Sequence, residues 1–190
     1  LVHEYLSSAI EHGKVGLTGS SYFGWTPQND IDVIIFTKPN DTADVITEIK
    51  RRTSEISWKD ALSIMIARQY LLQNLTMLTR IKNSISQRRV LGNNVFIRIL
   101  TVNPFTYSEC QYSILKEGEA RLHGIVIEEE SFVYPYTYKV RVLSSDFLEK
   151  DQEIIIISDR GRFSETACKG DEVKIKGDYE AKIYSPSRIE

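Results

Sequence analysis

Between residues 17 and 36 the chain combines a glycine–serine turn, two closely spaced aspartates and a strand-like apolar run. Gly19 and Ser20 follow a short apolar segment, and Asp30 and Asp32 introduce the apolar run. Residues two apart in a β-strand point to the same face, so we expect the two carboxylates to project together. Two neighbouring carboxylates repel each other unless a cation lies between them. Mg²⁺ prefers oxygen ligands of this kind. Because a glycine–serine turn suits a phosphate, the segment predicts a site for a phosphate that carries Mg²⁺.

The spacing of these residues resembles the signature of the DNA polymerase β-like nucleotidyltransferase superfamily, particularly its small, minimal members. Nine residues separate Ser20 from Asp30, and Asp30-Ile31-Asp32 continues into Val-Ile-Ile-Phe. The resemblance implies Mg²⁺-dependent transfer of a nucleotidyl group from a nucleoside triphosphate to a hydroxyl acceptor. It implies that Asp30 and Asp32 bind two Mg²⁺ ions and that Gly19 and Ser20 hold the triphosphate. The alternative is an acidic turn that merely starts a strand, where aspartate is common.

A third carboxylate, which active members of this superfamily carry on a later strand, is missing at the expected place. The strand expected here runs from Val95 to Val102, and its matching position is Arg98. Arginine would repel a second cation, although it could bind a phosphate with two N–H groups. Two hypotheses therefore stay open. Either another acid serves an active nucleotidyltransferase, or a catalytically degenerate domain binds nucleotides or nucleic acid.

Composition and charge narrow the class of protein. The 190 residues are 42% apolar and 26% charged, as in soluble globular proteins, and no apolar run approaches the roughly 20 residues of a membrane helix. A net charge of −2 gives no overall basic field, so nucleic acid would need a local patch. Cys110 and Cys168 have no metal-type spacing, and we expect a reduced, cytoplasmic protein without membrane contact. The leucine at position 1 suggests a fragment.

The first part, residues 1–106, is predicted to be an α+β domain with a nucleotidyltransferase-like mixed sheet and flanking helices. Helices are expected at 2–11, at 42–52 and from Ser57 to about Ile85, the last with or without a break. Ser57-Trp58-Lys59-Asp60 has a capping-box pattern at the start of this last helix, with aspartate in place of the usual glutamate. Strands are expected at 15–17, 31–36 and 95–102. The long helix is expected to have a basic side and end, which either faces solvent or holds a polynucleotide backbone. Its basic residues are Arg68, Arg80, Lys82, Arg88 and Arg89.

After a connector at 107–118, residues 119–190 predict a small all-β barrel. Five short strands, a mid-strand Gly124 and a Gly170-Asp171 turn resemble an OB-fold. In an OB-fold, Tyr134 and Tyr136 would be candidates for stacking on RNA or DNA bases. The alternative is that both tyrosines belong to the core, because they share a parity with Val140 and Val142. The basic residues that would contact phosphate are Lys139, Arg141, Arg160 and Arg162.

Overall fold

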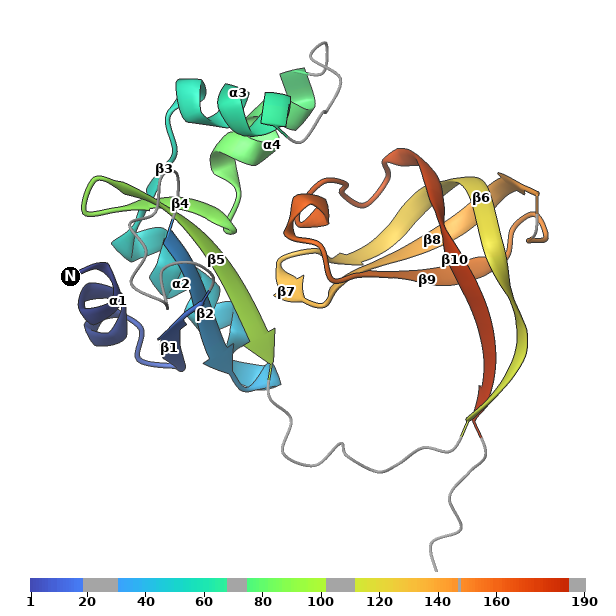
Figure 1. Ribbon diagram of the computed structural model, residues 1–190, viewed down its shortest axis with the longest axis horizontal. Coiled ribbons are helices and arrows are strands. Elements are labelled where there is room, and N and C mark those ends of the chain that lie inside the picture. The colour runs from blue at the N-terminus through green and yellow to red at the C-terminus, as the bar shows by residue number, and fades with distance from the viewer. Residues whose placement is uncertain (19–30, 68–74, 102–111, 147, 185–190) are drawn as a thin grey trace, which may run out of the picture. The chain divides into compact units, whose positions relative to one another are not determined.

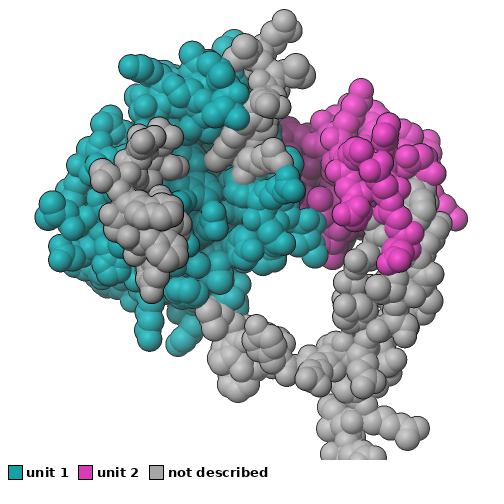
Figure 2. Space-filling model, in the orientation of Figure 1, with its two compact units in different colours: residues 1–102, 130–137, 157–166 teal, residues 103–129, 138–156, 167–190 magenta. Residues whose placement is uncertain are grey.

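The computed structural model describes residues 1–18, 31–67, 75–101, 112–146 and 148–184, and it shows a mixed α+β chain with two sheets (Figure 1). The chain divides into two compact units (Figure 2). The first unit comprises residues 1–102, 130–137 and 157–166, and the second comprises 103–129, 138–156 and 167–190. Two stretches of the C-terminal half therefore belong to the unit that holds the predicted nucleotide site. No helix in the described ranges is long and apolar enough to span a membrane.

The sheet of the first unit is mixed. Strand β2 pairs antiparallel with β1 and parallel with β5, so the expected mixed sheet is present. One edge of β5 is shared: β4 pairs with its first half, and β7 pairs with Ile99 and Leu100. In the described residues the order is β1 (Gly13–Leu17), β2 (Ile31–Thr37), β5 (Asn93–Thr101), β4 (Gln87–Val90) and β3 (Ser54–Glu55), with β7 (Val133–Tyr134) beside β5.

Helices α1 (Val2–Ala9) and α2 (Thr42–Arg52) cover one face of this sheet (Figure 1). Strand alternation turns every second residue of β2 and β5 toward the helices, where the apolar stripe of each helix meets them. The bounds of α2 agree with the prediction, the short 3₁₀ helix η2 (Pro39–Asp41) leads into it, and α1 ends two residues earlier than expected. The core between helices and sheet includes Leu6, Val33, Ile35, Val45, Ile49, Val95, Ile97 and Ile99.

The long helix expected from Ser57 is two helices, α3 (Trp58–Ala67) and α4 (Leu75–Asn83), which together form a small apolar cluster of their own. The capping pattern at its start is confirmed. The Asp60 amide donates to Ser57 Oγ at 3.1 Å, and that hydroxyl donates to the Asp60 carboxylate at 2.7 Å.

The assignment of Arg88 and Arg89 to a helix end is wrong, because both residues lie in strand β4. Arg88 is buried against the sheet edge. Its guanidinium donates to Thr53 Oγ1 at 2.8 Å and to the Thr53 carbonyl at 3.2 Å. A buried, hydrogen-bonded arginine cannot serve as a solvated or polynucleotide-binding helix face.

The second unit contains a four-stranded sheet in the order β10-β6-β8-β9. The last two of the five expected strands form one continuous strand, β10. Gly177 and Asp178, which lie between the two expected strands, pair with Ala120 and Glu119 and so continue the ladder. The described strands follow an open path, so the architecture in this part of the chain is a sheet and not a closed barrel. The strands are β6 (Tyr112–Glu130), β8 (Tyr136–Ser145), β9 (Glu153–Ser158) and β10 (Glu172–Tyr184), and the 3₁₀ helix η3 (Gly161–Phe163) follows β9.

Gly124 brings two strands of this second sheet close together. A Cβ atom there would lie 2.5 Å from Val140 Cγ1 and 2.6 Å from the Arg141 carbonyl oxygen. Only a residue without a side chain fits at this position, beside a core that contains Leu122, Val126, Tyr138 and Val140.

Candidate functional site

The face of the first sheet opposite α1 and α2 carries the described polar residues of the predicted site, and we call it the site face. Val33 and Ile35 point into the helix-covered core, so the alternate residues Asp32 and Ile34 project from the site face. On β5 the same alternation places Phe96 and Arg98 on the site face. Two adjacent parallel strands thus bring Asp32 and Arg98 to one surface.

The predicted loop joins the sheet next to Asp32. The Thr18 amide donates to the Asp32 carbonyl oxygen at 3.0 Å, which extends the β1–β2 pairing by one residue. Gly19 and Ser20 come next in the sequence, and Asp30 directly precedes β2, but these three residues lie outside the described ranges. Of the five predicted site residues, the structure therefore places Asp32 and Arg98.

The register of β2 and β5 shows which residue of β5 lies next to Asp32. Phe96 lies directly beside Asp32, while Arg98 pairs with Ile34 two residues further along the strands. The neighbour of Asp32 on β5 is therefore a phenylalanine that is 5% exposed, and not a carboxylate.

The Arg98 guanidinium has one buried donor that is not used among the described residues. Its guanidinium carbon lies 5.3 Å from the centroid of the Phe96 ring, within the range of a cation–π contact. Its Nε atom is buried and has no hydrogen-bond partner in the described part of the chain. A buried donor without a partner is costly, and a phosphate oxygen would satisfy it.

A stretch from the C-terminal half also reaches the site face. Residues Ile157–Thr166, which we call the strap, belong to the first unit. A Cβ atom on Gly161 would lie 2.5 Å from Cζ of Phe96, so the strap backbone is packed directly against that ring. The residue beside Asp32 is thus held from a distant part of the chain.

A complete metal site is not present within the described residues, where no group of three or more His, Cys, Asp and Glu side chains could hold a metal ion. Mg²⁺ is commonly held by one or two carboxylates together with phosphate oxygens and water. Of the two predicted metal ligands, the structure describes Asp32, and Asp30 lies outside the described ranges.

The two tyrosines proposed for base stacking differ in burial, because Tyr136 is buried and Tyr134 is half-buried. Tyr136 is fully buried, and its ring meets Tyr134 edge-on with centroids 5.9 Å apart. Lys139 and Arg141 both pair with Glu153, at 3.0 and 3.1 Å, and the hydrogen bond from Lys139 lowers the pKa of Glu153 most. The core interpretation is confirmed for Tyr136, which has no exposed surface for a base, and the role of Tyr134 stays a prediction.

Basic side chains on the second sheet also lie next to acidic ones, which offset their charge. Lys176 and Arg121 lie near Glu119, at 3.0 and 3.9 Å, and His123 contacts Glu172 at 2.5 Å. Such pairs offset basic charge that a nucleic-acid backbone would otherwise attract. Contact between this unit and RNA or DNA stays a prediction.

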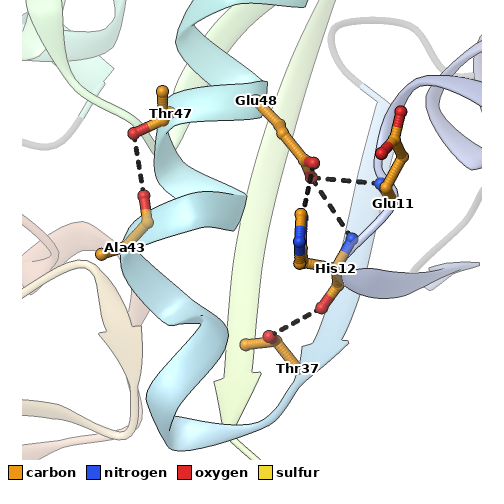
Figure 3. A network of polar contacts seen from close by, with 6 residues as sticks. All are labelled: Glu11, His12, Thr37, Ala43, Thr47 and Glu48. Atoms are coloured by element: carbon orange, nitrogen blue, oxygen red, sulfur yellow. Dashed lines mark hydrogen bonds and ion pairs between the residues drawn. The ribbon is translucent and has the colours of Figure 1, made fainter.

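A polar network that the sequence analysis did not identify lies on the helix side of the first sheet (Figure 3). The buried Glu48 carboxylate accepts hydrogen bonds from the amides of Glu11 and His12, at 3.1 and 3.4 Å, and contacts His12 Nδ1 at 2.7 Å. Thr37 Oγ1 donates to the His12 carbonyl at 3.0 Å. The network fixes the turn between α1 and β1 to α2, and a lone glutamate in a helix gives no local sequence signal for it.

Both partners of the ion pair have shifted pKa values. The hydrogen bond with Glu48 raises the pKa of His12 above its usual 6.5. Burial by itself would raise the pKa of Glu48, but the hydrogen bonds from His12 outweigh burial, and the pKa falls below 4.5. The pair is therefore charged over a wider pH range than isolated side chains would be.

No protein-family model matches this chain, and no curated protein or solved structure is similar to it at a significant level.

Proposed function

We propose that this protein binds a nucleoside triphosphate together with Mg²⁺ at the site face, as a nucleotidyltransferase-like domain. The observation that carries the proposal is the placement of Asp32 and Arg98 on one face of two adjacent parallel strands. Asp30 and Asp32 would hold the ion, and Gly19 and Ser20 would contact phosphate groups. Arg98 would donate to a phosphate oxygen through the nitrogen that has no partner.

The electrostatics of this arrangement suit a polyphosphate. Asp32 and Arg98 are offset by two residues along the strands, a separation of about 7 Å. A metal ion beside Asp32 and a guanidinium at that offset can neutralise different phosphate groups of one chain. The bound Mg²⁺ would supply charge neutralisation that the two aspartates alone cannot provide.

Nucleotidyl transfer to a hydroxyl acceptor is the second candidate, and the Asp30-Ile31-Asp32 spacing favours it. Two-metal transfer needs carboxylates that hold both ions. The register partner of Asp32 is Phe96, which cannot bind a cation in that way. Binding without transfer is therefore the function that the described geometry supports better.

Calorimetric titration of Mg²⁺-ATP and Mg²⁺-CTP tests the binding proposal. We expect Asp32→Asn and Arg98→Leu each to weaken binding by about tenfold or more, the equivalent of one lost charge-assisted contact. Asp178→Asn is the matched control, because this exposed aspartate lies on β10 in the second unit. Removal of Mg²⁺ with EDTA should reproduce the loss seen for Asp32→Asn.

The same samples separate the two candidates when pyrophosphate release is assayed with pooled RNA as acceptor. Binding without release supports a nucleotide-binding module, and release that Asp32→Asn abolishes supports a transferase. Unchanged binding in Asp32→Asn would refute the site assignment.

A further inference from the structure

Glu165 fastens the strap to the first unit with unusually many contacts. Its carboxylate accepts hydrogen bonds from the Ile85 amide, the Ser86 amide and Ser86 Oγ, each at 2.8 Å. These contacts span about 80 residues of sequence, since Glu165 lies 80 positions after Ile85 and 79 after Ser86. The carboxylate thus caps two consecutive amides at the junction of α4 and β4.

The backbone of Glu165 is held in a costly conformation. Its φ of 52° lies in the left-handed region, which residues other than glycine rarely adopt. Its amide donates to the Ser131 carbonyl at 3.0 Å, and Arg80 Nη1 donates to the Thr166 carbonyl at 3.3 Å. Such a conformation persists where surrounding contacts over-determine it, and it often marks functional segments.

A chain of contacts connects this anchor to the nucleotide site. The buried Ser164 hydroxyl donates to the Gly161 carbonyl at 2.7 Å, which fixes the turn between the anchor and Gly161. Gly161 packs against the Phe96 ring, and that ring lies beside Asp32 and under the Arg98 guanidinium. Movement of the strap would therefore release the surface on which Arg98 rests.

We propose that Glu165 is a positioning residue of the nucleotide site. By holding the strap against Phe96, it fixes the orientation of the Arg98 guanidinium and closes the site beside Asp32. This inference rests on the proposed function and deepens it, since it makes nucleotide affinity dependent on a segment from the C-terminal half. By linkage, bound nucleotide should in turn stabilise the docked strap.

Two variants disturb the strap from different sides. Glu165→Gln removes the negative charge and leaves one of the capped amides opposite an NH₂ group, without a change in side-chain size. Gly161→Ala places a methyl group 2.5 Å from Phe96 and leaves the Glu165 contacts in place. Glu149→Gln, at an exposed position, and Gly177→Ala, where a Cβ atom would meet nothing within 4 Å, are the matched controls.

Mg²⁺-ATP affinity is measured by calorimetry for each variant, and hydrogen exchange is followed at the amides of Ile85 and Ser86. We expect Glu165→Gln and Gly161→Ala to weaken Mg²⁺-ATP binding by about fivefold or more and both controls to bind like the wild type. Exchange at the two amides should rise in Glu165→Gln, and Mg²⁺-ATP should slow it in the wild-type protein.

A double-mutant cycle distinguishes positioning from general stability. If Glu165 acts through Arg98, the Glu165→Gln change should have little further effect on affinity in an Arg98→Leu background. Independent, additive losses would overturn the inference, and so would wild-type affinity in both strap variants. Absence of Mg²⁺-ATP binding by the wild-type protein would overturn the proposed function as well, which separates the two failures.

Discussion

Two carboxylates of the first unit, Glu48 and Glu165, each accept hydrogen bonds from two consecutive backbone amides, but they differ in burial and in their third partner. Glu48 accepts from the amides of Glu11 and His12, and Glu165 accepts from those of Ile85 and Ser86. Glu48 is 6% exposed and has a titratable partner, whereas Glu165 is half-buried and has a hydroxyl as its third donor.

The two carboxylates differ in burial and in the sequence distance that they bridge. Glu48 joins helix α2 to a turn 36 and 37 residues earlier, beside the buried core, so its loss should affect the folded state as a whole. Glu165 joins segments 79 and 80 residues apart. Since it retains access to solvent, its loss should open the strap locally and leave the core folded.

The largest effect on stability is expected from Glu48→Ala. This change leaves two amides without their acceptor next to a buried core, and we expect the free energy of unfolding to fall by about 2 kcal/mol. Urea unfolding measures the difference, with Glu165→Ala as the companion variant. A larger loss in Glu165→Ala than in Glu48→Ala would reverse the comparison.

A pH effect of intermediate size is expected from the Glu48–His12 pair. The raised pKa of His12 stabilises the fold fully below pH 6.5, and this contribution disappears as the pH rises through the folded-state value. The lowered pKa of Glu48 stabilises the fold above pH 4.5, and that contribution is lost as the pH falls through its folded-state value. The pair therefore contributes most between about pH 4.5 and 6.5.

The measurement is urea unfolding at pH 5.5 and at pH 8.5. We expect the wild-type protein to lose stability between these two values and His12→Asn to lose less. Glu165→Gln should retain the wild-type difference, because no histidine contacts Glu165 in the described residues. An identical pH dependence in wild type and His12→Asn would contradict the assigned role of His12.

The smallest effect is expected from Ser86→Ala, which removes one of the three donors to Glu165 and leaves both amides in place. The free energy of unfolding should fall by about 1 kcal/mol, the usual value of one intramolecular hydrogen bond. Ser63→Ala on α3 is the control, because its exposed hydroxyl only contacts the Lys59 carbonyl in its own helix. A wild-type result for Ser86→Ala would show that the amides alone hold Glu165.

Elements that depend on residues close together in the sequence were predicted well. Helix α2 has its predicted bounds, and the Ser57–Asp60 capping interaction is present. Each depends on residues within a few positions of one another, so local propensity and local hydrogen bonding determine them. The pairing of β2 with a strand on each side also agrees with expectation, because a nearly continuous apolar run is typical of a buried central strand.

Features that depend on distant partners were not predictable in this way. Arg88 belongs to a strand because β4 pairs with β5 and β3, and its guanidinium donates to Thr53. Nothing in the sequence around Arg88 specifies these partners. The register that places Phe96 beside Asp32 differs by two residues from one that would place Arg98 there, and both satisfy the same alternation. The strap depends on contacts with Ile85 and Ser86, which only the folded chain reveals.

The shared edge of β5 has a practical consequence for anyone who expresses parts of this chain. β7 covers the backbone of Ile99 and Leu100, and it comes from residues beyond the expected connector at 107–118. A fragment that ends at residue 106 would keep β4 on the first half of that edge and leave the second half bare. Bare strand edges recruit other strands, so such a fragment is expected to self-associate, and supplying residues 107–190 as a separate chain should suppress the association.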